Sequence, residues 1–171
     1  MCFEDIPHCI LTHCYLDHIG ACADLKKAIP EIKFYAHQLD AKPIEEPGHD
    51  DRTAASWYGV MFEPVKLHRR FEKDTILTFG NYKFQCIHTP GHTPGSISVI
   101  VESEGKKILF GQDLHGPFND DFLSNLYDYQ SSMQTLLELN ADILCEGHYG
   151  IFQPEHQVRK YIETYKSQNQ P

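Results

Sequence analysis

Residues 10–20 read ILTHCYLDHIG, an apolar run that ends in two histidines and an aspartate. The overlapping residues 9–12 (CILT) predict a short buried strand. Alternate residues of the extended loop beyond it project to the same side, so His13, Tyr15 and Asp17 are expected to face one site. Imidazole and carboxylate together suit Zn²⁺, Fe or Mn rather than Ca²⁺ or Mg²⁺. The stretch therefore predicts a metal site at the end of the first strand.

Three later segments place metal-binding side chains after predicted strands in the same way. His92 lies in HTPGHTPGS, Asp113 in LFGQD and His148 in CEGHYG. The backbone is fixed where a strand ends and the loop beyond it is free, so such side chains can converge at one edge of a sheet. The four segments together predict one metal centre.

Each of these residues taken singly has a simpler interpretation. Asp17 stands where the N-cap of a helix over 17–29 is expected. Asp113 suits a turn, and any single histidine suits the surface or a satisfied place in the core. The placement of all of them after strand ends favours the metal centre over these separate interpretations.

Hydrophobic periodicity elsewhere predicts a mixed α/β chain. Antiparallel hairpins are expected over 75–88 and 96–111, and a loop with a broken helix around Pro43 and Pro47. The further expected strands are 33–36 and 142–145, and the further expected helices are 120–139 and a terminal helix that starts at Pro154. The helix over 120–139 is expected to bury one side, made of Leu123, Leu126, Tyr127, Met133, Leu136 and Leu137.

The segment RTAASWYGVMF (52–62) is rich in aromatic residues and could be helical. Its large side chains are Trp57, Tyr58, Met61 and Phe62. They either pack in the core or form a lid or pocket wall beside a substrate. The loops 43–70 and 115–122 are expected to build the pocket walls.

Composition indicates one globular domain, residues 1–171. Hydrophobic residues make up 41% of the chain and charged residues 23%, which argues against disorder. The net charge of −9 disfavours a nucleic-acid binder, because such proteins need clustered Lys and Arg. No apolar run approaches the roughly 18 residues of a membrane helix, so no membrane association and a cytoplasmic location are expected.

The six cysteines carry no CxxC spacing, which disfavours a cysteine zinc site. Most of them lie in apolar stretches, which predicts buried free thiols in a reducing compartment rather than disulfides. They are Cys2, Cys9, Cys14, Cys22, Cys86 and Cys145.

The segments THCYLDHIG, HTPGHTPGS, LFGQD and EGHYG resemble the metallo-β-lactamase superfamily. Its members carry a His-x-His-x-Asp-His loop, a lone histidine, a bridging aspartate and a final histidine in that order. The resemblance covers almost the whole chain and implies an αββα sandwich. Family members place several strands ahead of the loop, which here starts at residue 13, so the usual N-terminal strands are expected to be lacking.

The resemblance also implies the ligands and the chemistry. It assigns His13, Tyr15 and His92 to a first metal position, with Asp113 between the two metals. It assigns Asp17, His18 and His148 to the second position. One or two Zn²⁺ ions per chain are implied, with Fe or Mn as alternatives. Asp17 and Asp113 would hold a metal-bound hydroxide, the nucleophile of a hydrolase that acts on a small ester, thioester or lactone.

Tyr15 stands where the family has the second histidine of the loop. A phenol has an ordinary pKa of about 10 and must lose its proton to be a good ligand, whereas neutral imidazole binds at pH 7. The second metal position is therefore expected to fill before the first.

The first twelve residues include six that are apolar or cysteine, namely Met1, Cys2, Phe3, Ile6, Cys9 and Ile10. A sheet edge without its usual neighbours invites pairing with another chain. A homo-oligomer, or a partner segment that covers the N-terminal edge, is therefore expected.

Two alternatives to a hydrolase stay open. A mononuclear iron dioxygenase of the same superfamily would need only one retained metal position. A catalytically impaired short member could act as an assembly subunit. His88 and His115 lie near the ligands in sequence and are either partners or proton carriers of the centre, or ordinary polar neighbours.

Overall fold

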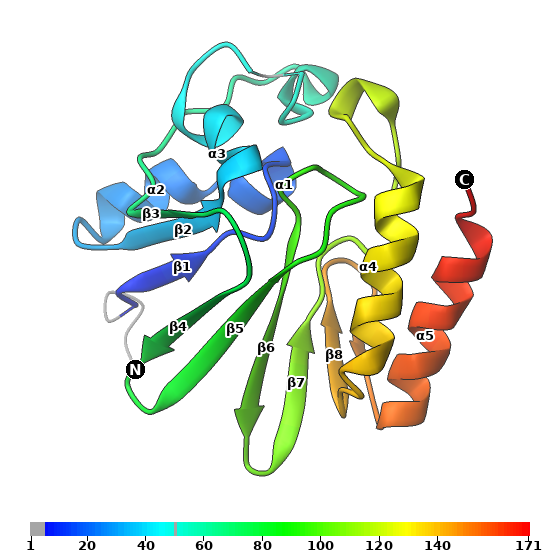
Figure 1. Cartoon of the computed structure of the whole chain (residues 1–171). Coiled ribbons are helices and arrows are strands. Elements are labelled where there is room, and N and C mark those ends of the chain that lie inside the picture. The colour runs from blue at the N-terminus through cyan, green and yellow to red at the C-terminus, as the bar shows by residue number, and fades with distance from the viewer. Residues whose placement is uncertain (1–5, 50) are drawn as a thin grey trace.

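The computed structural model describes residues 6–49 and 51–171 and places nine strands of that part of the chain in two sheets (Figure 1). The smaller sheet is parallel, with the order β1-β2-β3. The larger sheet has the order β4 to β9 and is antiparallel except between β7 and β8. The strands are β1 (His8–Ile10), β2 (Lys33–His37), β3 (Arg69–Phe71), β4 (Thr75–Phe79), β5 (Tyr82–His88), β6 (Ile97–Ser103), β7 (Lys106–Phe110), β8 (Ile143–Glu146) and β9 (Gly150–Phe152).

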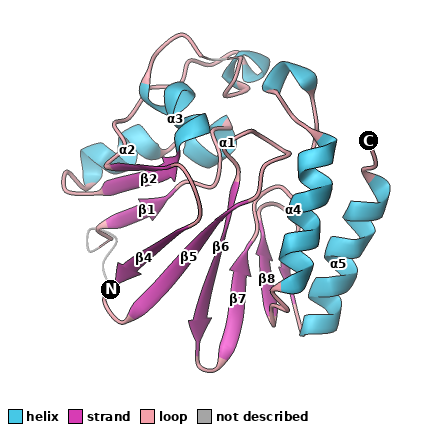
Figure 2. Cartoon of the chain, viewed as in Figure 1, coloured by secondary structure: helices cyan, strands magenta, loops and turns pink. Residues whose placement is uncertain are grey.

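Helices cover the outer faces of both sheets (Figure 2). The first three lie over the smaller sheet, and α4 and α5 lie side by side against the larger one, so the layers follow the expected αββα order. The helices are α1 (Leu16–Ile19), α2 (Cys22–Ala28), α3 (Gln38–Glu45), α4 (Leu126–Glu138) and α5 (Glu155–Gln168), with short 3₁₀ turns η2 (Ala55–Tyr58) and η3 (Asp120–Phe122). The mixed α/β sandwich predicted from the sequence is confirmed.

The core is built from side chains that alternate along the strands of the larger sheet. Ile97 and Val99 of β6 pack toward the smaller sheet, against Tyr35. Ile100 points the other way and packs under α4 and α5 with Leu109. Successive side chains of β6 thus point to opposite faces of the sheet, and its apolar residues are divided between two core layers.

Asp17 is not the N-cap of a helix, contrary to the sequence prediction. The helix α1 begins one residue earlier with Tyr15 at its N-cap, and Asp17 lies in its first turn. The predicted helix is also divided into α1 and α2, with Gly20 and Ala21 between them. The carboxylate of Asp17 is therefore free of backbone capping and lies beside His148.

The aromatic segment 52–62 forms only the 3₁₀ turn η2, and core packing is wrong for most of it. Trp57 is 60% exposed, Tyr58 65% and Met61 90%, whereas Phe62 is buried. The positive φ angles of Ala54 and Gly59 bound the turn and stop a longer helix.

The predicted helix over 120–139 starts only at Leu126. The side chain of Asn125 accepts hydrogen bonds from the amides of Tyr127 and Asp128 and so caps the helix there. Met133 and Leu136 are buried as expected, but Leu123 is 54% exposed and Tyr127 74% exposed.

Three other elements also differ from the sequence prediction. The helix α3 continues through Pro43, where a broken helix was expected. The strands β3 and β9 were not predicted, because they are too short to show an alternation of apolar and polar residues.

The five described cysteines form no disulfide within the described residues, and Cys2 lies outside them. Burial raises the pKa of Cys14 well above its ordinary value and that of Cys22 to about 12. Such thiols stay protonated and unreactive at neutral pH. In the described part of the chain no helix is both long and apolar enough to span a membrane.

Candidate metal centre

The six histidines and aspartates predicted as ligands converge at one edge of the two sheets. They come from the loop after β1 with the start of α1, the β5–β6 loop, the segment after β7 and the β8–β9 loop. They form two groups of possible metal ligands that share Asp113. The first group is His13, His92 and Asp113, and the second is Asp17, His18, Asp113 and His148.

The donor atoms of the second group are closely and evenly spaced. Nε2 of His18 lies 3.2 Å from Oδ1 of Asp113 and 3.3 Å from Nε2 of His148. Nε2 of His148 lies 3.3 Å from the same Asp113 oxygen and 3.1 Å from Oδ2 of Asp17. His18 and Asp17 are 3.6 Å apart at Nε2 and Oδ2.

These separations fit a tetrahedral zinc ion. Ligand bonds of about 2.0–2.1 Å in tetrahedral geometry put the donor atoms about 3.3 Å from one another. The five separations given above run from 3.1 to 3.6 Å, and all the donor atoms of the group lie within 4.8 Å of one another. Two facing imidazole nitrogens at 3.3 Å also need either a shared proton or a cation between them. The second group therefore fits a metal ion without rearrangement.

The first group contains buried imidazole nitrogens that make no hydrogen bond. Nε2 of His13 and Nε2 of His92 are both in this state, and both side chains are fully buried. They lie 3.9 Å and 3.5 Å from Oδ2 of Asp113. Nδ1 of His92 is 2.9 Å from the carbonyl of Pro117, to which it donates. The Nε2 lone pair of His92 is thus left free to bind a metal ion, as in other metal-binding histidines.

Burial keeps these imidazoles neutral. It lowers the pKa of His92 to about 4 and that of His13 well below its ordinary value. Burial acts to raise the pKa of Asp113, but the hydrogen bond to His18 and the neighbouring imidazoles outweigh it and lower that pKa. Neutral His13 and His92 beside an ionised Asp113 are the protonation states that metal binding requires. For His18, burial acts to lower the pKa, but the hydrogen bond to Asp113 and the nearby carboxylates outweigh it and raise that pKa.

Tyr15 is buried beside the first group but its hydroxyl is directed elsewhere. Its ring lies edge-on to His13 at 5.0 Å and to His92 at 4.5 Å between ring centroids. The hydroxyl lies 3.5 Å from the backbone carbonyl of His92, to which it donates. Burial raises the phenol pKa, so the ligand-competent phenolate is disfavoured.

Asp40 connects two of the ligand-bearing loops and was not predicted from the sequence. It is fully buried, and its Oδ2 accepts hydrogen bonds from the amide of Cys14 at 3.1 Å and from Oγ1 of Thr93 at 2.6 Å. Its Oδ1 accepts the amide of Gly95 at 2.9 Å. The bonded residues are neighbours of His13 and His92, so Asp40 fixes the distance between these two loops.

Glu146 was also missed, although it lies in the quoted segment CEGHYG. It is 7% exposed, and its Oε2 accepts the amides of His148 and Tyr149 at 2.8 Å each. Its Oε1 lies 2.7 Å from Nδ1 of His115. His115 is therefore oriented beside the centre. His88 instead stacks on His37 and bonds the carbonyl of Pro94, which makes it an ordinary polar neighbour.

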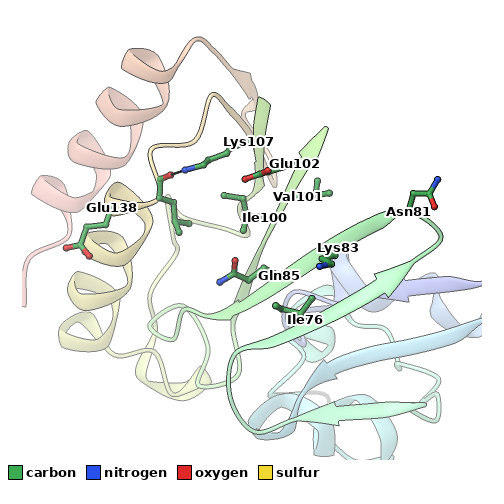
Figure 3. A pocket seen from close by; sticks show the side chains of 10 residues that line it. Ile76, Asn81, Lys83, Gln85, Ile100, Val101, Glu102, Lys107 and Glu138 are labelled. Atoms are coloured by element: carbon green, nitrogen blue, oxygen red, sulfur yellow. Dashed lines mark hydrogen bonds between the residues drawn. The ribbon is translucent and has the colours of Figure 1, made fainter. Parts of the chain in front are cut away.

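A cavity of about 280 Å³ opens onto the centre. Asp17, Asp113 and His148 line it at the centre. The other side chains that line it are Tyr15, Ala54, Trp57, Tyr58, His115, Pro117, Phe122 and Tyr149. A separate hollow of about 660 Å³ lies over β4–β6 and the end of α4, with Lys83, Glu102 and other mixed side chains around it (Figure 3). None of the residues of the centre lines this hollow, so the smaller cavity is the candidate substrate site.

Gly147 leaves room for the carboxylate of Asp113, which gives a direct test of the centre. A Cβ at this position would lie 2.5 Å from Oδ1 of Asp113, and its backbone is not in the left-handed region. Gly147→Ala should therefore displace Asp113 and weaken zinc binding at least tenfold, about the effect of disturbing a ligand's orientation. Zinc titration of the metal-stripped protein measures this.

Gly105→Ala is the control for that substitution. A Cβ there meets open space, although φ is +75°, so it tests backbone strain alone. It should leave zinc affinity unchanged. Equal zinc affinity in Gly147→Ala and the wild type would contradict the placement of Asp113.

Comparison with known proteins agrees with this architecture. Residues 4–148 match the model of the Metallo-beta-lactamase superfamily. The chain is 31% identical over 150 residues to hydroxyacylglutathione hydrolase GloC of Haemophilus influenzae, covering 84% of this chain and 68% of that protein. It is 33% identical over 173 residues to acyl-coenzyme A thioesterase MBLAC2 of Gallus gallus, covering 88% of this chain and 59% of that protein.

Solved structures support the same fold. A metallo-beta-lactamase of Cronobacter sakazakii superposes with a TM-score of 0.80 at 20% identity, covering 98% of this chain and 73% of that one. A class B3 di-zinc metallo-beta-lactamase from an Alaskan soil metagenome superposes with a TM-score of 0.76 at 24% identity, covering 98% of this chain and 71% of that one. With the match over residues 4–148, the chain belongs to the metallo-beta-lactamase superfamily.

Proposed function

We propose that this protein is a metal-dependent hydrolase of a small ester, thioester or lactone. The observation that carries the proposal is the pair of ligand groups sharing Asp113 at the floor of a cavity. His13, His92 and Asp113 would hold one ion, and Asp17, His18, Asp113 and His148 the other. Zn²⁺ is the first candidate because the donors are imidazole and carboxylate with tetrahedral spacing.

A divalent ion held here would lower the pKa of a water molecule toward neutrality and polarise a substrate carbonyl. The chain's own residues supply position and charge. Asp113 is buried and joins both groups, so it fixes their distance. The side chain of Asp17 is 39% exposed at the cavity floor, where it can accept a proton from a reacting water. Asp17 and Asp113 are therefore the proposed catalytic carboxylates.

The named activities of two relatives support the thioester class. One is a hydroxyacylglutathione hydrolase and the other an acyl-coenzyme A thioesterase. The chain spans 68% and 59% of their lengths, so their substrates are guides to a first panel. We further propose a single domain over 1–171 and a cytoplasmic location, which the five free thiols support.

A substrate panel tests the proposed activity. Metal-stripped protein is assayed on neutral thioesters and lactones, with and without added Zn²⁺, Mn²⁺ or Fe²⁺. Turnover that requires the metal is expected. Absence of turnover with all three metals would contradict the hydrolase, and oxygen consumption with Fe²⁺ alone would favour the dioxygenase.

We also propose that the protein self-associates through the face of the larger sheet that points toward the smaller one. Phe110 pairs with Val99 on one side and with Cys145 on the other, and Cys145 pairs with Ile151. Directly paired residues share a face of a sheet. Val99 is buried, but Phe110 is 40% exposed and Ile151 66% exposed. The smaller sheet thus leaves part of this apolar face open.

Phe110→Lys should weaken self-association by about tenfold or more, because it places a charge within an apolar contact. Light scattering over a concentration series measures the effect. Ile76→Lys is the matched control, since Ile76 is 60% exposed on the opposite face of the same sheet. A wild-type protein that stays a monodisperse monomer would contradict the proposal.

A further inference from the structure

A row of aromatic rings leads from the surface down to the metal centre. Trp57 lies 4.6 Å from Phe122, and Phe122 lies 5.0 Å from Tyr15, between ring centroids. Tyr15 in turn lies 4.5 Å from the ring of His92. Trp57 is 60% exposed, whereas Phe122 and Tyr15 are buried, so the row has an outer end and an inner end. We call these three side chains the aromatic row.

The aromatic row forms one wall of the substrate cavity, because all three of its members line that cavity. Tyr15 stands in the loop between the ligands His13 and Asp17. In this position its ring presents an apolar edge next to the first ligand group. The wall therefore continues to the place where the reacting carbonyl would lie.

The charges of the described residues that line the cavity disfavour an anionic group on the substrate. Among the described residues that line it, none is lysine or arginine, and Asp17 and Asp113 are acidic. Nδ1 of His115 lies 2.7 Å from Oε1 of Glu146, so a third carboxylate already stands beside this imidazole. With only the more tightly bound ion in place, the carboxylates of Asp17 and Asp113 offset its charge of +2, so the centre offers no excess positive charge. A carboxylate or phosphate placed against the aromatic row would lose its hydration without gaining a partner.

We propose that the aromatic row selects substrates with a neutral, apolar acyl group, aryl or alkyl, attached to the scissile carbonyl. This rests on the proposed hydrolase function. The inner position of Tyr15 is the reason to assign the row to the acyl side, since its ring lies closest to the ligands. On this account the tyrosine is a substrate-binding residue in a place where a ligand was expected.

Trp57 allows the selection to be measured by binding alone, because it is the single tryptophan of the chain. The probes are phenylacetamide and the same amide with a para carboxylate on its ring. Both are titrated against the protein with and without Zn²⁺ while the Trp57 fluorescence is recorded. Phenylacetamide should change the fluorescence saturably, and the carboxylate should bind at least tenfold more weakly, about the effect of an unpaired charge.

Two variants locate the binding on the aromatic row. Phe122→Leu keeps an apolar side chain and should weaken phenylacetamide binding by about fivefold, the typical effect of removing one ring contact. Tyr82→Leu is the control, since Tyr82 is 50% exposed on β5 outside the cavity. Equal or tighter binding of the carboxylate, or no response to either probe, would overturn the proposal.

Kinetics give a second readout that separates the two proposals. Trp57→Ala should lower the kcat/KM for a phenylacetyl thioester relative to an acetyl thioester by about tenfold, mainly through KM. An unchanged ratio would overturn the role of the row. If the metal-loaded protein cleaves neither thioester, the hydrolase proposal fails, and the fluorescence titration still decides whether the row binds neutral apolar groups.

Discussion

Asp113→Asn should remove metal from both positions. It should lower kcat/KM by about a thousandfold or more, because the activated water and the stabilisation of the transition state by the metal are lost together. The carboxylate faces four imidazoles at 3.2 to 3.9 Å. An amide of the same shape has no charge to offset the metal. Its NH₂ group would also donate hydrogen bonds to the imidazole nitrogens whose lone pairs are needed to bind the metal. Both ligand groups lose their shared member at once.

The shared role of Asp113 is tested by comparison with Asp17. Asp17 belongs to the second group alone, so Asp17→Asn should remove one ion and leave the first position able to bind. Asp121→Asn, on the exposed turn η3, is the control and should change neither metal content nor activity. Metal analysis of the three variants distinguishes the loss of both ions, of one ion and of none. Full metal content in Asp113→Asn would contradict the assignment of the bridging ligand.

Asp40→Ala should lower the free energy of unfolding by about 3–5 kcal/mol, as when one partner of a buried ionic network is removed. The substitution leaves the amides of Cys14 and Gly95 and the hydroxyl of Thr93 without their acceptor. Arg52, whose guanidinium lies 3.8 Å from Oδ1 of Asp40, also loses its counter-ion. Because these groups hold the His13 and His92 loops, metal affinity at the first position should fall as well.

Urea unfolding of metal-free protein measures the stability effect without a contribution from bound metal. Asp51→Ala is the matched control, because Asp51 is exposed and near Arg52 in sequence, and it should change stability by no more than about 0.5 kcal/mol. A small effect of Asp40→Ala, similar to that of the control, would contradict the role of Asp40 as the connection between the loops.

The longer strands, the hairpins and the convergence of the candidate ligand residues could be predicted because their signals are local. An apolar run followed by histidine or aspartate marks each strand end, and the αββα order follows from the resemblance that these segments carry. Asp40 has no such signal. Its partners Cys14 and Thr93 are 26 and 53 residues away in the chain, so only the folded structure brings them together.

The sequence predicted the direction of some side chains but not their hydrogen-bond partners or their exposure. Alternation in the loop placed Tyr15 toward the centre, which its position between His13 and His92 bears out. The direction of its hydroxyl depends on the carbonyl of His92, which belongs to another loop. The exposure of Trp57 likewise depends on the short turn η2, whose ends at Ala54 and Gly59 need positive φ angles.

Zinc titration of the metal-stripped wild-type protein tests the central claim most directly. The second group offers four donors with near-tetrahedral spacing. The first offers three, since the Tyr15 hydroxyl stays protonated and donates a hydrogen bond to the backbone carbonyl of His92. We predict one tightly bound Zn²⁺ per chain followed by a second, weaker one, and a gain in affinity at the weaker position in Tyr15→His. Two equally tight ions, or no zinc binding, would contradict the account.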